Sequence, residues 1–469
     1  MRKLLSLLIC TFFTFGCTMA PKYRTPLQDM PEASENQGDI SPFTNSEWWT
    51  MFGDDVLNSL VKETLENNKD LQSAMAKVEE ARAQLRISRA DLMPSIGAGI
   101  QGSWGTVTSN GVLIEDPVQS YITGLSASWE LDLWGKQRSL TKAAKAQFFV
   151  TKAARDLVRL TLEANVVNAY FLVLTLDEQL AAAKSMLDDD EETVKIYKDR
   201  YEAGLIAEID LRRIEADMES VRATYQGLQR QLLEAQSALA VIAGRSPKEI
   251  VSGNIQRGKP LDQIILIPEI PEGIPSGILA KRPDVLQAEE SLIAANAQIG
   301  AARASYFPSI SLTGEAGYAS DTLTNLITGV GGVWNLAANL MQPIFEGGKI
   351  RAQNKAAKAV YKEQLAAYQL IVQNAFKDVY DSLNANKINR EVFDSTNKET
   401  QDMERSFEIA ADQYKAGLID TINLLDVKRT LLQARMNLAS ARYGQLTAAV
   451  SLSKALGGGW NEQDFKKSK

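Results

Sequence analysis

Two long stretches of the chain lack any helix breaker, and they are equally long. Neither glycine nor proline occurs from Lys136 to Ala203 or from Lys349 to Ala416, so each stretch has 68 residues. At about 1.5 Å per residue, each can form a helix on the order of 100 Å long. Gly204 and Gly417 follow directly, and glycine accepts the left-handed conformation that ends a helix. We therefore predict two very long helices, each followed by a turn.

The two stretches belong to an internal repeat, because three motifs recur at almost one offset of 213 or 214 residues. A shared offset indicates two copies of one structural unit. The motif pairs are RADLMPSI at 89–96 and RASYFPSI at 303–310, YEAGLI at 201–206 and YKAGLI at 414–419, and GK at 135–136 and 348–349.

Apolar residues follow each turn glycine at alternating spacings of three and four. In the first copy this seam begins at Leu211 and Ile214, and it returns in the second copy at Leu424 and Val427. Such spacing is typical of packed helix pairs. Many alanines permit close helix approach, which suits a wall of helices. An ordinary four-helix bundle fits the same pattern.

Each copy also contains two segments that alternate between apolar and polar residues, as strands with one wet face do. We expect strands at about 95–106, 121–134, 309–319 and 333–345. Their lengths are close to the roughly 9 to 11 residues that a tilted strand needs to cross a bilayer. A closed membrane barrel needs about eight strands or more. Several chains must therefore pool their strands, because an open edge is not tolerated in hydrocarbon.

The N-terminus has the pattern of an export signal. Arg2 and Lys3 precede the apolar stretch from Leu4 to Phe15, and Gly16 precedes Cys17. The residues TFGC at 14–17 resemble a lipoprotein processing box, in which Cys17 would carry acyl chains, and an ordinary signal peptide is the alternative. No later run of about 18 apolar residues occurs, so we expect no membrane-spanning helix.

Composition excludes several function classes. The chain has no histidine, which removes the commonest general base and a common metal ligand. Its formal charge is −7 with dispersed basic residues, which argues against nucleic-acid binding. No phosphate loop or metal-ligand cluster occurs, and acidic runs such as Asp188 to Asp190 are expected on solvated helix faces. We expect no enzymatic activity, no cofactor and no metal site.

The expected organisation follows the repeat. The parts are a signal peptide at 1–16, a lipid-anchored segment at 17–53, a first repeat at 54–245, a linker at 246–282, a second repeat at 283–456 and a tail at 457–469.

Taken in order, the motifs resemble the TolC-like outer-membrane factor family, in its lipoprotein branch that serves resistance-nodulation-division (RND) pumps. The resemblance covers essentially the whole mature chain. The motifs are CTMAP at 17–21, WW at 48–49, WELDLWGK at 129–136, RPD at 282–284, RASYFPSISL at 303–312, PIF at 343–345, LLD at 424–426 and LGGGW at 456–460.

The resemblance implies a mainly α-helical fold with membrane β-structure. Three chains would form one twelve-stranded β-barrel and one hollow periplasmic α-barrel in the cell outer membrane. The homotrimer would be a passive exit duct that docks to a periplasmic adaptor and an RND inner-membrane transporter. Drugs, solvents and other amphiphiles are the cargo expected first. The alternatives are a heavy-metal efflux duct and a periplasmic coiled-coil lipoprotein that never spans the membrane.

The resemblance also implies a gate near the second helix turn. By distance from Gly417, the gate aspartate falls on Asp426, the apolar ring on Ile422 and a latching tyrosine on Tyr414. Asp210 and Arg213 occupy the corresponding turn of the first copy and are candidate partners. A ring of like carboxylates in a constriction repels itself and attracts cations, so it favours cation passage.

Overall fold

The computed structural model describes residues 18–26, 43–106, 108–109, 112–113, 118–253, 255–265, 282–328, 331–458 and 460. The predicted signal peptide, Cys17 and most of the linker and tail lie outside these residues. The chain divides into two compact units, which are described separately. The first comprises Met1–Gln28, Ala76–Lys152 and Gln287–Gln369, and the second comprises Asp29–Met75, Ala153–Leu286 and Leu370–Lys469.

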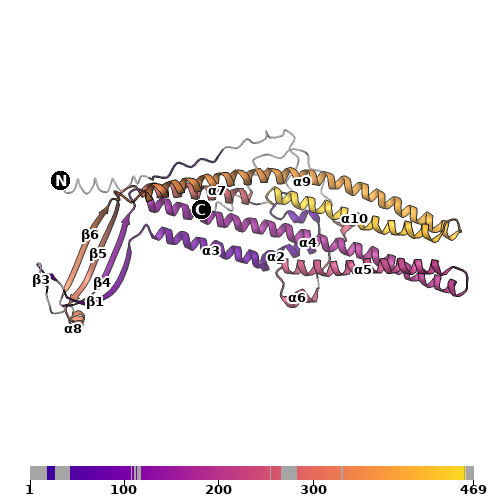
Figure 1. The fold of residues 1–469 in the computed structure, drawn as a ribbon, viewed down its shortest axis with the longest axis horizontal. Coiled ribbons are helices and arrows are strands. Elements are labelled where there is room, and N and C mark those ends of the chain that lie inside the picture. The colour runs from indigo at the N-terminus through magenta and orange to yellow at the C-terminus, as the bar shows by residue number, and fades with distance from the viewer. Residues whose placement is uncertain are drawn as a thin grey trace. The chain divides into compact units, whose positions relative to one another are not determined.

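The first unit contains a four-stranded antiparallel sheet (Figure 1). Its strands are β1 (Ser95–Gly105), β4 (Val118–Leu131), β5 (Ser309–Ser320) and β6 (Gly332–Met341), and they pair in the order β1-β4-β5-β6. The short strands β2 (Thr108–Ser109) and β3 (Val112–Leu113) pair with each other, and helix α8 (Leu323–Thr328) lies between β5 and β6 in the chain. In this sheet β1 and β6 are both edge strands.

The register gives the sheet one apolar and one polar face. Ala98, Leu125, Ala316 and Trp334 form one row across the four strands, and their sequence neighbours Gly97, Ser126, Glu315 and Asn335 form the next row on the opposite face. The large apolar side chains are exposed, with Trp334 at 80% and Ile100 at 75%. An apolar face of this size needs an apolar environment to cover it.

A row of glycines lets the two central strands approach closely. Gly99, Gly124 and Gly317 lie opposite one another on β1, β4 and β5. A Cβ added at Gly124 would lie 2.5 Å from the Ala316 carbonyl oxygen, and one added at Gly317 would lie 2.0 Å from the Thr123 carbonyl oxygen. Only glycine fits such spacing, which is typical of a sharp bend in a curved sheet.

The segment that follows Cys17 lies along α7 (Pro283–Ala304) within the first unit. The side-chain amide of Asn296 donates to the carbonyl oxygen of Pro21 at 2.8 Å, and the Thr25 hydroxyl donates to Glu289 at 2.9 Å. A Cβ at Gly300 would lie 2.6 Å from the Cβ of Ala20, so the absence of a side chain there permits the close contact.

The predicted long helices are confirmed as α4 (Lys136–Glu202) and α9 (Lys349–Lys415), each of 67 residues. They pair with α5 (Glu208–Ile242) and α10 (Thr421–Ala455) in two antiparallel hairpins. The shorter helices α2 (Asp55–Asn67) and α3 (Lys69–Ala90) precede β1. The predicted fold class, mainly helical with four antiparallel strands in a tandem repeat, is thus confirmed.

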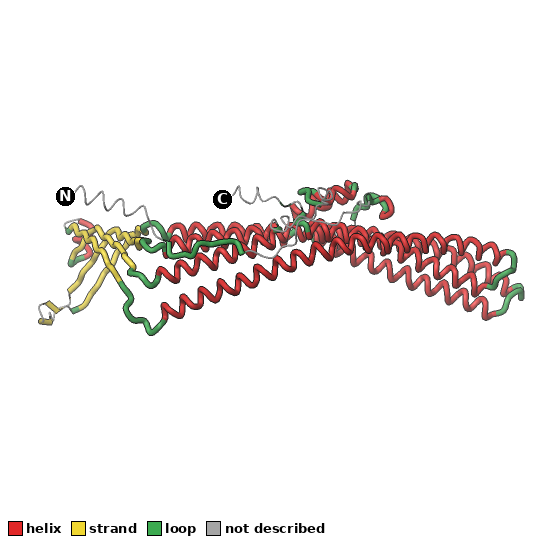
Figure 2. Tube along the Cα trace, turned by 90° about the horizontal axis from the view of Figure 1, so that it is seen from above, coloured by secondary structure: helices red, strands yellow, loops and turns green. Residues whose placement is uncertain are grey.

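Both hairpin turns have the same backbone conformation. They are the two green loops that join the long helices in Figure 2. Gly204 has φ +70° and Gly417 has φ +73°. In each turn the glycine N–H donates to the residue three positions back, and the next N–H donates to the residue five positions back. This bonding satisfies carbonyl groups that a helix end otherwise leaves unpaired.

The aromatic core of the second unit surrounds the middle of α4. Trp48 and Phe52 of the short helix η1 (Trp48–Phe52) are buried, and Phe52 packs edge-on against Phe171 at 4.9 Å between ring centroids. The Tyr170 hydroxyl donates to Asp54 at 2.9 Å, and Asp54 also caps α2. Two minor helices, α6 (Pro247–Ser252) and η2 (Leu261–Gln263), belong to the same unit.

Arg282 connects the start of α7 with α9 and the end of α10. Its guanidinium donates to Asp284 at 2.8 Å, to Asp378 of α9 at 3.0 Å and to the carbonyl oxygen of Ala455 at the end of α10 at 3.1 Å. The side chain is only 9% exposed. The motif RPD at 282–284 is therefore structural, because a buried guanidinium must satisfy its donors within the fold.

The expectation that no helix spans the membrane stays a prediction, although one helix meets a test of length and composition. Among the described residues α4 passes this test of length and composition, with a mean hydropathy of 1.4 in its most apolar window of 18 residues. Of that window, 56% is buried inside the structure. The core helix of a soluble protein passes the same test, and α4 carries the aromatic core described above.

Candidate functional site

The candidate gate lies in the second unit, where the two helix turns are held together by an apolar cluster. Its buried members come from α4, α5 and α10, and Tyr414 of α9 packs against them. The helix pairs of both repeats therefore contribute to one small core close to the turns. The buried residues are Val194, Tyr197, Leu211, Ile214 and Leu425.

Three hydroxyl groups join the repeats beside this cluster. The hydroxyl of Tyr197 on α4 is hydrogen-bonded to that of Tyr414 on α9, and it lies 2.8 Å from Oγ1 of Thr421 at the start of α10. Burial raises the pKa of Tyr197 to about 12, and the bond to Tyr414 adds to the shift. The Tyr197 phenol is therefore neutral at physiological pH. Tyr414 was predicted as a latching residue, and the structure gives it Tyr197 as a partner within the same chain.

Farther from the turns, ion pairs connect α10 to the first repeat. The ammonium group of Lys428 lies 2.6 Å from Oδ1 of Asp190 on α4, and their side chains are 9% and 3% exposed. Arg429 pairs with Asp217 of α5, whose carboxylate is also buried. Burial raises the pKa of the Asp190 carboxyl, and Lys428 opposes that shift. The four side chains form a charged network across three helices.

This network corrects one expectation from the sequence. The run from Asp188 to Asp190 was assigned to a solvated helix face, whereas Asp190 is buried and paired with Lys428. Asp188 and Asp189 conform to the expectation, since both are exposed. The buried heptad seam of α4 passes through position 190, and Val194 and Tyr197 continue it. That spacing is the signal that could have located Asp190.

Asp426 and Ile422 lie on the opposite side of α10 from the buried Lys428. Ile422 is 51% exposed, and Asp426 is exposed as well. Because they are four residues apart on one helix, they share a face. The Asp426 side chain makes no hydrogen bond or ion pair with any residue in the described part of the chain. The two predicted gate residues are thus free to face a pore.

The structure does not bring the first-repeat candidates to these residues. The backbone N–H of Asp210 donates to the carbonyl oxygen of Ala207, and Arg213 is exposed. Across the described ranges of this single chain, neither side chain forms an ion pair with Asp426 or a hydrogen bond with Tyr414. Their partnership with the gate stays a prediction.

Comparison with known proteins extends over the whole chain. The model of the family described as outer membrane efflux protein matches residues 60–245 and 274–458, one match for each repeat. The toluene efflux pump outer membrane protein TtgC of Pseudomonas putida is 34% identical, over 98% of this chain and 96% of TtgC. The cation efflux system protein CusC of Escherichia coli is 32% identical, over 97% of this chain and 99% of CusC.

A solved structure has the same fold. The crystal structure of the Campylobacter jejuni outer membrane channel CmeC superposes with a TM-score of 0.89 at 28% sequence identity. The match covers 96% of this chain and 97% of CmeC.

Proposed function

The chain belongs to the outer membrane efflux protein family and is an outer-membrane channel component of an efflux system. We propose that three copies of it form the passive exit duct of a tripartite pump. In this proposal an RND transporter in the inner membrane supplies the energy, and a periplasmic adaptor joins it to the duct. The described part of one chain contributes a sheet of four strands, too few for a closed pore, so the transport activity belongs to the assembly.

One observation carries the proposal: the sheet has an apolar face, a polar face and two edge strands. Four strands cannot close a barrel, since about eight are needed. The apolar face, with Ile100 and Trp334, suits lipid, and the polar face suits a water-filled lumen. Pooling the sheets of three chains would pair every edge strand, which the bilayer interior requires.

The experiment is to isolate outer-membrane fractions and compare heated with unheated samples by gel electrophoresis, with and without crosslinking. A duct gives a heat-modifiable species and crosslinks up to a trimer. A periplasmic coiled-coil lipoprotein gives no heat-modifiable band. Such a result would overturn the proposal.

The lipid anchor is part of the proposal and rests on the sequence. Cys17 lies outside the described residues, and the segment directly after it is held along α7. Acyl chains on Cys17 would anchor that segment in the inner leaflet of the outer membrane. Metabolic labelling with palmitate should mark the wild-type protein, and Cys17→Ser should abolish the label. Label retained by that variant would refute the anchor.

For the cargo, we rank drugs, solvents and other amphiphiles first and metal cations second. TtgC is described as part of a toluene efflux pump, and CusC is described as part of a cation efflux system. A deletion strain tested against dyes, detergents, solvents and metal salts separates the two. Sensitivity confined to metal salts would reverse the ranking.

A further inference from the structure

The parts of the chain that form the sheet and its loops contain only acidic charges. No lysine or arginine occurs between Arg89 and Lys136 or between Arg303 and Lys349. These two intervals contain eight acidic residues, namely Asp91, Glu115, Asp116, Glu130, Asp132, Glu315, Asp321 and Glu346. Basic residues are frequent elsewhere in the chain, with 51 in all, so the sheet region is a distinct electrostatic zone.

Within the four strands there are two carboxylates, on Glu130 and Glu315, and both lie on the polar face of the sheet. Glu130 lies near the end of β4, and its carboxylate is 3.6 Å from the ammonium group of Lys136. Glu315 lies in the middle of β5, is exposed, and has no ion-pair partner among the residues that the structure describes. Its charge is therefore not neutralised by the chain itself.

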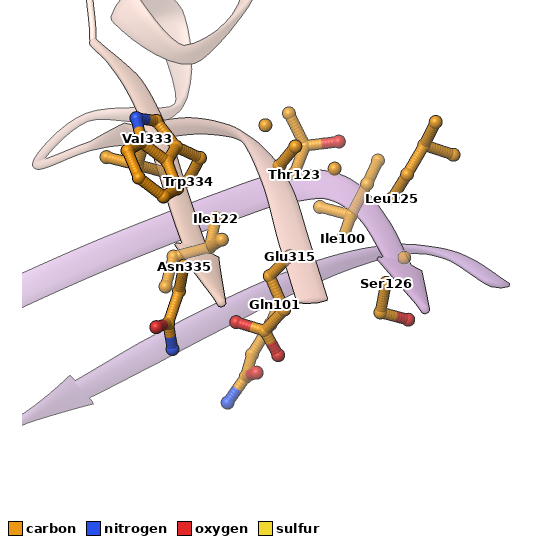
Figure 3. A pocket seen from close by; sticks show the side chains of 14 residues that line it. Ile100, Gln101, Ile122, Thr123, Leu125, Ser126, Glu315, Val333, Trp334 and Asn335 are labelled. Atoms are coloured by element: carbon orange, nitrogen blue, oxygen red, sulfur yellow. The ribbon is translucent and has the colours of Figure 1, made fainter. Parts of the chain in front are cut away.

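The residues directly opposite Glu315 on the two neighbouring strands are neutral and polar. The register places Ser126 of β4 and Asn335 of β6 directly opposite it. Figure 3 shows Gln101, Ser126, Glu315 and Asn335 on one side of the strands, while Ile100, Thr123 and Leu125 point to the other side. These residues belong to a groove of about 420 Å³ that is lined by all four strands.

The environment strengthens the effect of this charge. If the apolar face meets lipid, the polar face with Glu315 lines the lumen of the barrel. Low-dielectric walls focus the field of a fixed charge into the aqueous space between them. Rings of carboxylates are a common device for cation preference in pores. Each added copy of the chain contributes one more Glu315 at the same depth.

We propose that Glu315 makes the membrane-spanning part of the duct prefer cations, so that cationic and neutral cargo passes more readily than anionic cargo. This inference rests on the proposed function. Glu315 lies on strand β5 in the first unit, whereas the gate residue Asp426 lies on helix α10 in the second unit.

The test uses the full-length protein in planar lipid bilayers under a KCl gradient. Wild-type channels should show a reversal potential on the cation-selective side, and Glu315→Gln should shift it toward zero. Glu315→Asp keeps the charge and should keep the wild-type value. Measurements in an Asp426→Ala background remove the gate carboxylate from the comparison.

A charge moved to the adjacent strand provides the decisive control. Asn335→Asp in the Glu315→Gln background restores one carboxylate opposite position 315 and should restore the cation preference. A merely structural role of Glu315 would not be rescued in this way. An unchanged reversal potential in Glu315→Gln channels overturns the inference and leaves the duct intact. If the wild-type protein forms no channels at all, the proposed function fails instead.

Discussion

Asp426 and Tyr414 lie a few residues from the same turn, yet their surroundings differ. The Tyr414 hydroxyl has a hydrogen-bond partner in Tyr197, whereas the Asp426 carboxylate has none in the described part of the chain. A residue that holds helices together needs partners within the fold. A residue that acts on passing ions needs exposure. The surroundings of the two residues thus differ, and their roles in a gate stay predictions.

Replacing Asp426 by Ala should raise the single-channel conductance in planar bilayers. The change removes a ring of carboxylates from the narrow end of the proposed duct, together with the electrostatic repulsion and cation binding of that ring. Asp426→Glu keeps the charge and is the matched control. Conductance and cation selectivity that stay at wild-type values in the Ala variant would refute the gate assignment.

Burial of the Tyr197 hydroxyl, together with its bond to Tyr414, should make the stability of the turns depend on alkaline pH. Folding raises the pKa of Tyr197 from 10.0 to about 12, so the folded state favours the neutral phenol. This contribution is fully present below about pH 10 and is lost as the pH rises toward 12. Burial also raises the pKa of other tyrosines, such as Tyr23 and Tyr170, so the informative quantity is the difference between wild type and Tyr197→Phe.

Limited proteolysis at the two turns, followed from pH 9 to pH 12, measures that difference. This pH range begins just below the ordinary tyrosine pKa of about 10. Wild type should lose its protection more steeply than Tyr197→Phe. Parallel curves for the two proteins would show that this hydroxyl does not contribute to the stability of the turns.

At the scale of elements, the charged network decides how α10 is held to the first repeat. The pair of Lys428 and Asp190 is almost fully buried, and Arg429 adds a second bridge to Asp217. Removing one member of a buried pair leaves an uncompensated charge, which costs more than the pair itself contributes. Exposed pairs such as Lys415 with Asp412 contribute little by comparison.

Lys428→Met should therefore destabilise the helical part by about 3 to 5 kcal/mol, because Asp190 is left buried without its cation. A lower thermal unfolding midpoint, followed by circular dichroism at the helix band, measures the loss. Lys415→Met is the control and should change the midpoint little. If both variants unfold at the same temperature, the buried pair has no special role. Adding Asp190→Leu to Lys428→Met should recover part of the stability.

At the scale of the whole molecule, the two faces of the sheet make the chain dependent on a membrane and on further copies of itself. Neighbouring residues on one strand should therefore tolerate a charge very differently. Ile100 lies on the apolar face and Gln101 on the polar face of β1. This alternation supplies a matched pair of variants.

Ile100→Lys should reduce the amount of folded protein in the outer membrane, since a lysine facing lipid costs about 2 to 4 kcal/mol at the bilayer midplane. Gln101→Lys puts the same charge in the lumen and should assemble normally. Quantifying the heat-modifiable species for both variants measures the effect. Equal assembly would contradict the assignment of the apolar face to lipid.

Much of the fold followed from periodicity along the chain. The windows without glycine or proline predicted both long helices. The alternation at 121–134 predicted β4, although that strand begins earlier, at Val118, and ends at Leu131. The repeat predicted that Gly204 and Gly417 would have equivalent turns, and their φ values agree. These features depend on local backbone preferences, so the residues of one segment are enough to predict them.

The contacts of the candidate site could not be obtained in this way. Tyr197 and Tyr414 are separated by 217 positions, and Asp190 and Lys428 by 238. Their pairing depends on how two helix hairpins pack against each other. Asp190 was assigned to solvent because its neighbours in the sequence are acidic. Its burial is set by the face of α4 that meets α10.

The sequence by itself therefore determined the duplicated unit, the long helices, the turn glycines and the four alternating strands, because each of these is a periodic or local property of the backbone. Only the tertiary structure decided which carboxylates are buried and paired, and which are left exposed, as Asp426 and Glu315 are. Whether a carboxylate is buried depends on packing between segments far apart in the chain. Because burying an unpaired charge costs free energy, a buried carboxylate needs a cation beside it.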